Sequence, residues 1–408
     1  MGLAFVVAAC RQPSAQTPPS IPDAGPPQPH AALVTDAAVD APSIADPVRE
    51  AYAAIREGRF ADARRLLEKH DDAGSRCWGS VRASVLPNGG MRVAAPRGLV
   101  VTNPAGEIVH HEVVTGCLRR ADESLRITST DGAIRIVEST GTADLTYEDT
   151  GDPLAQLVFV SSSWALAVDA GGEYVALNRA DGHVLRGRHG ADPSLASHWM
   201  RPVGAALAGD RVVVDRGTQI VLLRADGQSV DVRGCKGKLL AAQSTETGER
   251  ALHVTSTMDV ESTDTRVCLV KDDGTTRKIV PLGSATCGLA RAMPCPYALQ
   301  ASTRRLLGFG SMRGGFVLVD VVAGRLVTVP LPPGAYPDGL SPGGFSSCGG
   351  GELCISYTSS ANGDNGMSAV RMNGAKLTTR VRTKEADPDD AWCELAGLPV
   401  PKAVCAAE

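Results

Sequence analysis

Residues Tyr174–Arg186 read Tyr-Val-Ala-Leu-Asn-Arg-Ala-Asp-Gly-His-Val-Leu-Arg. Four apolar residues precede the pair Asp181-Gly182, and Val184 and Leu185 follow it. An Asp-Gly pair is a strong hairpin signal because both residues tolerate positive φ. The stretch therefore predicts two antiparallel strands joined by a tight turn.

The same unit recurs along the chain after residue 77, each time with a glycine in the turn. The turn glycines are Gly106, Gly132, Gly182, Gly227, Gly274, Gly324 and Gly374. Five of the six spacings are 45 to 50 residues, the length of one four-stranded propeller blade. Radial repetition also protects the strand edges of a long all-β chain. We expect an all-β fold, a β-propeller over 77–405, with seven blades; the short first spacing leaves six or eight open.

Composition excludes several classes of protein. The 408 residues are 43% hydrophobic and 21% charged, which rules out a wholly disordered chain. A net charge of -4 gives no basic field of the kind that nucleic-acid binders carry. The longest apolar run, Leu3–Cys10, is too short to span a membrane.

The N-terminus ends its apolar run with Val7-Ala8-Ala9-Cys10. This resembles the bacterial lipobox, in which small residues precede a cysteine that receives a diacylglyceryl group. The resemblance implies a signal peptide over 1–9 and a lipid on Cys10. No Lys or Arg precedes the run, which a start codon further upstream would explain. The alternative is a core element that ends in a buried cysteine.

Two segments follow the lipobox. Residues 10–45 are rich in Pro and Ala and predict a disordered, lipid-anchored linker. Residues 46–72 carry apolar positions at helical spacing on both sides of Gly58. They resemble one tetratricopeptide-like helical hairpin. A solenoid needs about three repeats, so we expect a single hairpin beside the main domain.

The ten cysteines after Cys10 are an even number, which in an exported chain favours disulfides. The close pairs are Cys287 with Cys295 and Cys348 with Cys354. More distant candidate pairs are Cys235 with Cys268, Cys393 with Cys405, and, by elimination, Cys77 with Cys117. Sequence alone does not determine this connectivity. The chain lacks a Cys-x-x-Cys pair, so we expect no metal site.

The segment Val175–Arg186 is similar to the repeat of quinoprotein-type and WD40-type propellers, and Phe316–Val327 is a looser copy. Arg186 stands where the quinoprotein repeat has its docking Trp. The resemblance therefore implies the fold without bound pyrroloquinoline quinone, and we expect no cofactor. Outer-membrane propeller lipoproteins that scaffold β-barrel assembly share the same broad plan.

Catalytic motifs are weak. Gly339–Gly343 fits the pattern Gly-x-Ser-x-Gly, but prolines on both sides oppose the strand and helix that a nucleophile elbow needs. The eight histidines show no metal-ligand spacing. The loop Asn362–Gly366 lacks the acidic spacing of a calcium-binding EF-hand.

These features favour a non-enzymatic binding or scaffold lipoprotein. We expect it to be held on the lipid bilayer by acylated Cys10, to bind an envelope protein, and not to bind nucleic acid. Arg11 stands where an Asp signals inner-membrane retention in lipoproteins, which favours the outer membrane. Two alternatives remain open: a hydrolase or quinoprotein-type enzyme working in the propeller channel, and an envelope polysaccharide binder.

Overall fold

A computed structural model describes most of the β-rich part of the chain. With short gaps, the described residues are 82–148, 156–191, 202–256, 264–311, 316–337, 345–359 and 365–382, together with isolated positions between 50 and 65. The predicted signal peptide, the linker and residues 383–408 lie outside them. None of the described helical residues belongs to a helix long and apolar enough to cross a membrane.

The strands form seven sheets of four or five strands, which we number in chain order. Sheet 1 holds β1 (Arg82–Val85), β2 (Met91–Ala95), β3 (Gly98–Thr102) and β4 (Ile108–Val113). Sheet 2 holds β5 (Cys117–Ala121), β6 (Arg126–Thr130), β7 (Ala133–Glu138) and β8 (Gly141–Thr146). Sheet 3 holds β9 (Gln156–Val160), β10 (Trp164–Asp169), β11 (Glu173–Asn178) and β12 (Val184–Arg188).

The remaining sheets continue this order. Sheet 4 holds β13 (Ala205–Ala208), β14 (Arg211–Asp215), β15 (Ile220–Leu223) and β16 (Ser229–Asp231). Sheet 5 holds β17 (Lys238–Ser244), β18 (Arg250–Thr255), β19 (Thr265–Val270) and β20 (Thr276–Gly283). Sheet 6 holds β23 (Ala298–Ser302), β24 (Leu306–Gly310), β25 (Phe316–Asp320) and β26 (Arg325–Val327).

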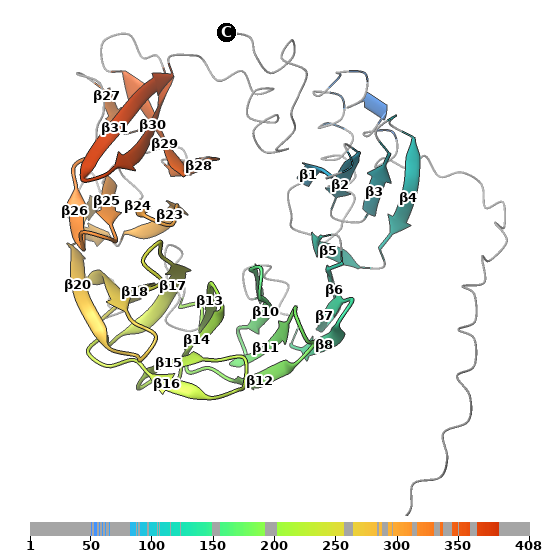
Figure 1. The fold of residues 1–408 in the computed structure, drawn as a ribbon, viewed down its shortest axis with the longest axis horizontal. Coiled ribbons are helices and arrows are strands. Elements are labelled where there is room, and N and C mark those ends of the chain that lie inside the picture. Colours follow the sequence, from blue (N-terminus) through green and yellow to red (C-terminus); the bar gives the residue numbers. More distant parts are fainter. Residues whose placement is uncertain are drawn as a thin grey trace, which may run out of the picture. The chain divides into compact units, whose positions relative to one another are not determined.

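Sheet 7 and a small hairpin complete the set. Sheet 7 holds β27 (Ala335–Pro337), β28 (Phe345–Gly349), β29 (Glu352–Ser359), β30 (Asn365–Asn373) and β31 (Lys376–Arg382). The strands β21 (Ala285–Cys287) and β22 (Met293–Cys295) pair by themselves. Every named pair is antiparallel, and in sheets 1 to 6 each strand pairs with the next along the chain. In Figure 1 the strands can be followed in this order by their colour.

Apolar cores lie between successive sheets and not within one sheet. Leu177 of sheet 3 belongs to a buried cluster with Ile136 of sheet 2, whereas Trp164 of sheet 3 joins a cluster with Val214 of sheet 4. The two middle strands of sheet 3 are buried along nearly their whole length, as expected for strands covered on both faces. Meandering four-stranded sheets stacked face to face are the architecture of a β-propeller.

The predicted fold class is thus confirmed: the described chain is an all-β propeller. Seven sheets are described, the number of units that the glycine period predicts. The number of blades in the closed ring stays a prediction.

Most of the predicted turn glycines share one position. Gly182, Gly227, Gly274, Gly324 and Gly374 all have positive φ and lie in the turn before the last strand of their sheets. This turn joins the third and fourth strands in sheets 3 to 6 and β30 and β31 in sheet 7. Gly132 lies one strand earlier, between β6 and β7. Its turn is a hairpin, as predicted, but it is not the equivalent turn, which explains the short first spacing.

Two of these glycines have a packing role in addition. A Cβ on Gly182 would lie 2.0 Å from the carbonyl oxygen of Thr140 in sheet 2. A Cβ on Gly274 would lie 2.1 Å from the carbonyl oxygen of Asp231 in sheet 4. Each turn therefore rests directly on the backbone of the preceding sheet, which only glycine allows.

A few helical positions precede the sheets. Glu50, Ala53 and Ala54 are helical, as are Asp62 and Arg65. The rest of the predicted hairpin over 46–72 lies largely outside the described residues, so the hairpin stays a prediction.

Candidate functional site

One end of the sheets carries a repeated set of charged side chains. Because neighbouring strands are antiparallel, the turn after the first strand and the turn after the third strand lie at the same end of each sheet. We call this end the turn face. Five arginines at or beside the start of a second strand, and one after a third strand, extend onto it. This arginine belt consists of Arg92, Arg126, Arg179, Arg211, Arg250 and Arg305.

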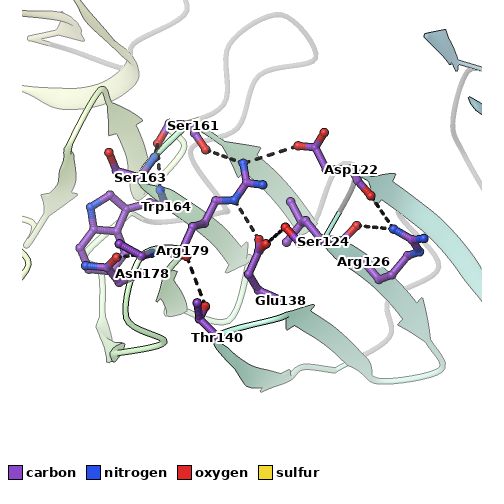
Figure 2. A network of polar contacts seen from close by, with 12 residues as sticks. Asp122, Ser124, Arg126, Glu138, Thr140, Ser161, Ser163, Trp164, Asn178 and Arg179 are labelled. Atoms are coloured by element: carbon purple, nitrogen blue, oxygen red, sulfur yellow. Dashed lines mark hydrogen bonds and ion pairs between the residues drawn. The ribbon is translucent and has the colours of Figure 1, made fainter. Parts of the chain in front are cut away.

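Arg179 joins sheets 2 and 3 (Figure 2). It follows β11, and its Nε lies 2.8 Å from Glu138 Oε2 at the end of β7. Its Nη1 donates to the carbonyl oxygen of Ser161 at 3.0 Å and lies 3.5 Å from Asp122 Oδ2. Ser124 Oγ donates to the other carboxylate oxygen of Glu138. One guanidinium thus satisfies a buried carboxylate and holds two sheets together.

Sheets 4 and 5 are joined by two arginines and two aspartates. Arg250 Nη2 lies 2.6 Å from Asp210 Oδ1 and 2.9 Å from Asp272 Oδ1. Arg211 Nη1 lies 2.9 Å from Asp210 Oδ2. The indole nitrogen of Trp164 donates to the carbonyl oxygen of Asp210 at 3.0 Å, which extends the network to sheet 3.

A third group of contacts joins sheets 5 and 6. Arg305 lies 3.4 Å from Glu246 and 3.5 Å from Asp320. Beside it, Arg277 donates to both carboxylate oxygens of Glu249, at 2.6 and 2.8 Å, and to the carbonyl oxygen of Val321 at 3.0 Å. These hydrogen bonds hold the pKa of Glu249 below its usual value.

The acids of the belt are mostly more exposed to solvent than the arginines. The side chain of Arg250 is 5% exposed, whereas those of Asp210 and Asp272 are 54% and 58% exposed. Asp122 and Glu246 are likewise more exposed than the arginines they pair with. Glu138 and Asp320 are the buried exceptions. The arginines are therefore less exposed than most of the acids they pair with, and the turn face presents carboxylate oxygens to solvent.

The hairpin turns add further acids to the same face. Asp181, Asp226 and Asp273 occupy the turns between the third and fourth strands of sheets 3, 4 and 5 and are exposed. Each accepts a hydrogen bond from the backbone N–H two residues later, at 2.8 to 2.9 Å. For Asp273 this bond lowers the pKa of the carboxyl group. These side chains fix their own turns and still carry a charge at the surface.

The belt was not found from the sequence. Its signal is an arginine directly before an apolar strand, as at Arg126, Arg211, Arg250 and Arg305. Such arginines are common in any exposed turn, and only the stacking of the sheets brings each one to an acid of its neighbour.

The structure pairs Cys235 with Cys268, one of the candidate pairs; their Cα atoms are 6.0 Å apart. Both lie in the apolar cluster between sheets 4 and 5. Cys117 and Cys354 are also disulfide-bonded. Backbone pairing brings the strands of Cys348 and Cys354, and those of Cys287 and Cys295, together. Cys10, Cys77, Cys393 and Cys405 lie outside the described residues.

The described residues add no support for the metal and nucleophile motifs. Across the described segments, no group of three His, Cys, Asp or Glu side chains is placed to hold a metal ion. Gly339–Gly343 lies outside them, and Asn365 and Gly366 open strand β30. His253 is buried in β18 with its ring 4.9 Å from that of Phe309. Burial lowers the pKa of His253 to about 3.

No protein-family model matches the chain, and no curated protein matches it. Among solved structures it is similar to BamB from Moraxella catarrhalis, with 13% identity over 74% of this chain and 88% of that one and a TM-score of 0.37. It is also similar to dihydro-heme d1 dehydrogenase NirN, with 13% identity over 74% and 66% and a TM-score of 0.39. A third similarity is to the Swd1 β-propeller domain from Myceliophteria thermophila, with 8% identity over 74% and 97% and a TM-score of 0.34.

Proposed function

We propose that the protein is an exported, lipid-anchored binding or scaffold protein of the cell envelope, and that it docks a partner protein on its turn face. The observation that carries the proposal is the arrangement of the belt: arginines hold carboxylates, most of them more exposed than the arginines, in fixed positions across neighbouring sheets. Exposed Lys271 and Arg304 lie in the same turns, so the face combines these carboxylates with basic residues, and a fixed pattern of charge suits recognition of a complementary surface.

The chemistry of the face indicates the kind of partner. Carboxylates are hydrogen-bond acceptors only, so the array suits a protein surface that carries lysine and arginine side chains. Several such contacts at the rim of an interface would increase the association rate and make binding sensitive to salt.

Two features support the location. Disulfide-bonded cysteines favour an oxidising compartment outside the cytoplasm. The Val7–Cys10 lipobox and the Pro-rich segment after it would hold the propeller on a membrane by a tether, with the outer membrane favoured by Arg11.

The docking proposal is tested by removing charge without disturbing the fold. In the turn-face variant Asp181→Asn/Asp226→Asn/Asp273→Asn, the amide oxygen can still accept the backbone hydrogen bond of each turn. The control variant Asp131→Asn/Glu173→Gln/Asp264→Asn removes three exposed acids at the opposite ends of the third strands.

The full lipidated chain is used to capture partners from detergent-solubilised envelope by crosslinking, and the captured protein is then purified and titrated directly. We expect the turn-face variant to raise the Kd for the partner about tenfold and to make the Kd less dependent on salt. The control variant should change the Kd less than about twofold. Equal effects of the two variants, or the absence of any enriched partner, would contradict the proposal.

The lipid anchor has a separate test. Wild type and Cys10→Ala are expressed from an upstream start codon, and their N-terminal peptides are analysed by mass spectrometry. We expect a diacylglyceryl group on Cys10 and membrane association in the wild type, and the loss of both in the variant. An unlipidated wild type in the soluble fraction would reject the anchor.

A further inference from the structure

The two sides of sheet 2 differ in chemistry. On one side Ile127, Ile134, Ile136 and Leu145 are buried in the cluster shared with sheet 3. The alternate residues form the other side and are exposed or half-buried: Arg126, Thr128, Thr130, Ala133, Arg135, Val137, Thr142, Asp144 and Thr146. We call this second set the open side of sheet 2.

The open side faces sheet 1. Leu118 of β5 pairs with Thr128 and so lies on the same side of sheet 2. Leu118 packs in one cluster with Leu99 of sheet 1. Arg126, also on the open side, reaches Glu112 of β4. A surface that faces a neighbouring sheet is therefore polar and in contact with water.

Later sheets differ at the equivalent surface. The side of sheet 3 that faces sheet 2 carries Ala165, Ala167, Val175 and Leu177, all fully buried. The side of sheet 6 that faces sheet 5 carries Leu307, Phe309 and Val319, also buried. The difference is visible in the sequence. Strands covered on both faces are continuously apolar, as in β10, whereas β6 and β8 alternate polar and apolar residues as half-solvated strands do.

The apolar contact between sheets 1 and 2 is small in the described part of the chain. Its buried members are Leu99, Val114 and Leu118. On β4, the outer strand of sheet 1, His110 and Glu112 pair with Val101 and Leu99 and yet are about 40% to 50% exposed. The contact is thus confined to one part of the facing surfaces.

The ion pairs between these two sheets are long. Arg126 Nε lies 3.4 Å from Glu112 Oε2, and Arg92 Nη1 lies 3.8 Å from Asp122 Oδ1. The closest pairs that join sheets 2 and 3, and sheets 4 and 5, measure 2.8 and 2.6 Å. The pair that joins sheets 5 and 6 measures 3.4 Å, but there Arg277 also donates to the carbonyl oxygen of Val321 at 3.0 Å. Long, partly exposed pairs contribute little to stability.

We propose that the propeller opens between sheets 1 and 2, with sheet 1 moving on the contact around Leu99 and Leu118 while sheets 2 to 7 stay together as one body. Separation of these sheets removes little apolar area from contact, because most of the facing surface is already hydrated. The equivalent movement between later sheets would expose an apolar core.

The test compares two leucines that have the same strand position and the same burial. Leu99 lies in β3 and Leu177 in β11, both third strands, and both are fully buried between two sheets. Leu99→Cys and Leu177→Cys are introduced separately into the full chain with its disulfides intact. The rate at which a thiol reagent modifies each new cysteine is then followed by peptide mass spectrometry.

We expect Leu99→Cys to react at least tenfold faster than Leu177→Cys, at a rate that depends little on low concentrations of urea. Hydrogen exchange of the backbone amides in residues 98–113 must remain slower than this labelling, because the sheet moves without unfolding. Equal labelling rates overturn the proposal. So does labelling in step with amide exchange, which would mean that sheet 1 unfolds. If Leu99→Cys does not fold, Val114→Cys tests the same contact.

Discussion

Single residues in this propeller act by filling the space between two sheets, and His253 shows this most clearly. It lies in the interface between sheets 5 and 6, edge-on to Phe309. No hydrogen-bond partner for its Nε2 occurs in the described structure. The surroundings stabilise the neutral ring, and this couples folding to pH.

We expect acid to destabilise the protein through His253. Its pKa falls from 6.5 to about 3 in the folded state, so below pH 6.5 the unfolded chain binds the proton more tightly. Above pH 6.5 His253 does not lower the free energy of unfolding. As the pH falls from 6.5 toward 3, the free energy of unfolding decreases by about 1.4 kcal/mol per pH unit through this group. Urea unfolding at pH 7.5 and pH 5 measures it.

His253→Phe should lose this part of the pH dependence, because the ring can no longer take up a proton. His183→Gln, at an exposed histidine, should keep it. The same slope in both variants would show that His253 is not responsible.

Removal of a belt arginine should cost more stability when its partner acid is buried than when that acid is exposed. Arg179→Met leaves Glu138, whose side chain is 3% exposed, without its guanidinium, and we expect a loss of about 3 to 5 kcal/mol. Arg250→Met leaves Asp210 and Asp272 in contact with water, and we expect about 1 to 2 kcal/mol. The free energies of unfolding of the two variants are compared, and Glu138→Gln in the Arg179→Met background should restore part of the loss. A larger effect at Arg250 would contradict the role of burial.

At the scale of the element, the hairpin turn both reverses the chain and contacts the preceding sheet. The Asp-Gly pairs predict the reversal from sequence, because it depends on two adjacent residues. The contact with the preceding sheet could not be predicted, since it needs the stacking order and the twist of the sheets. For the same reason the sequence indicates which cysteines are close along the chain, but it does not single out Cys235 and Cys268.

Two glycines separate these roles. Gly274→Ala adds a Cβ 2.1 Å from a carbonyl oxygen, whereas Gly248→Ala has a similar positive φ and no atom within 4 Å. We expect losses of about 3 kcal/mol and about 1 kcal/mol, the second due to backbone strain alone. Thermal unfolding of both variants measures the difference, and equal losses would mean that the turn does not bear on sheet 4.

At the scale of the whole molecule, the sequence predicts the fold well because a period of 45 to 50 residues survives in the turns. It does not predict the charged face, since the belt contacts that join two sheets lie about 15 to 60 positions apart in the chain. The polar side of sheet 2 was readable in principle from the alternation in β6 and β8, but alternation alone does not say which sheet faces it.

The seven described sheets predict a closed seven-bladed ring. End-on class averages of the purified chain by electron microscopy should show sevenfold pseudo-symmetry. Six or eight blades in these averages would show that an undescribed segment adds a blade or that two of the described sheets share one.

The contact between a hairpin turn and the preceding sheet affects how the chain assembles during synthesis. In sheets 3 and 5 the turn glycine closes onto backbone that has already left the ribosome. Sheets 2 and 4, once formed, are thus templates for the sheets that follow them, and assembly acquires a direction there, from the N-terminal end to the C-terminal end. A chain that stalls during synthesis would hold its completed sheets in their final arrangement and would present only the last of them as an unfinished surface.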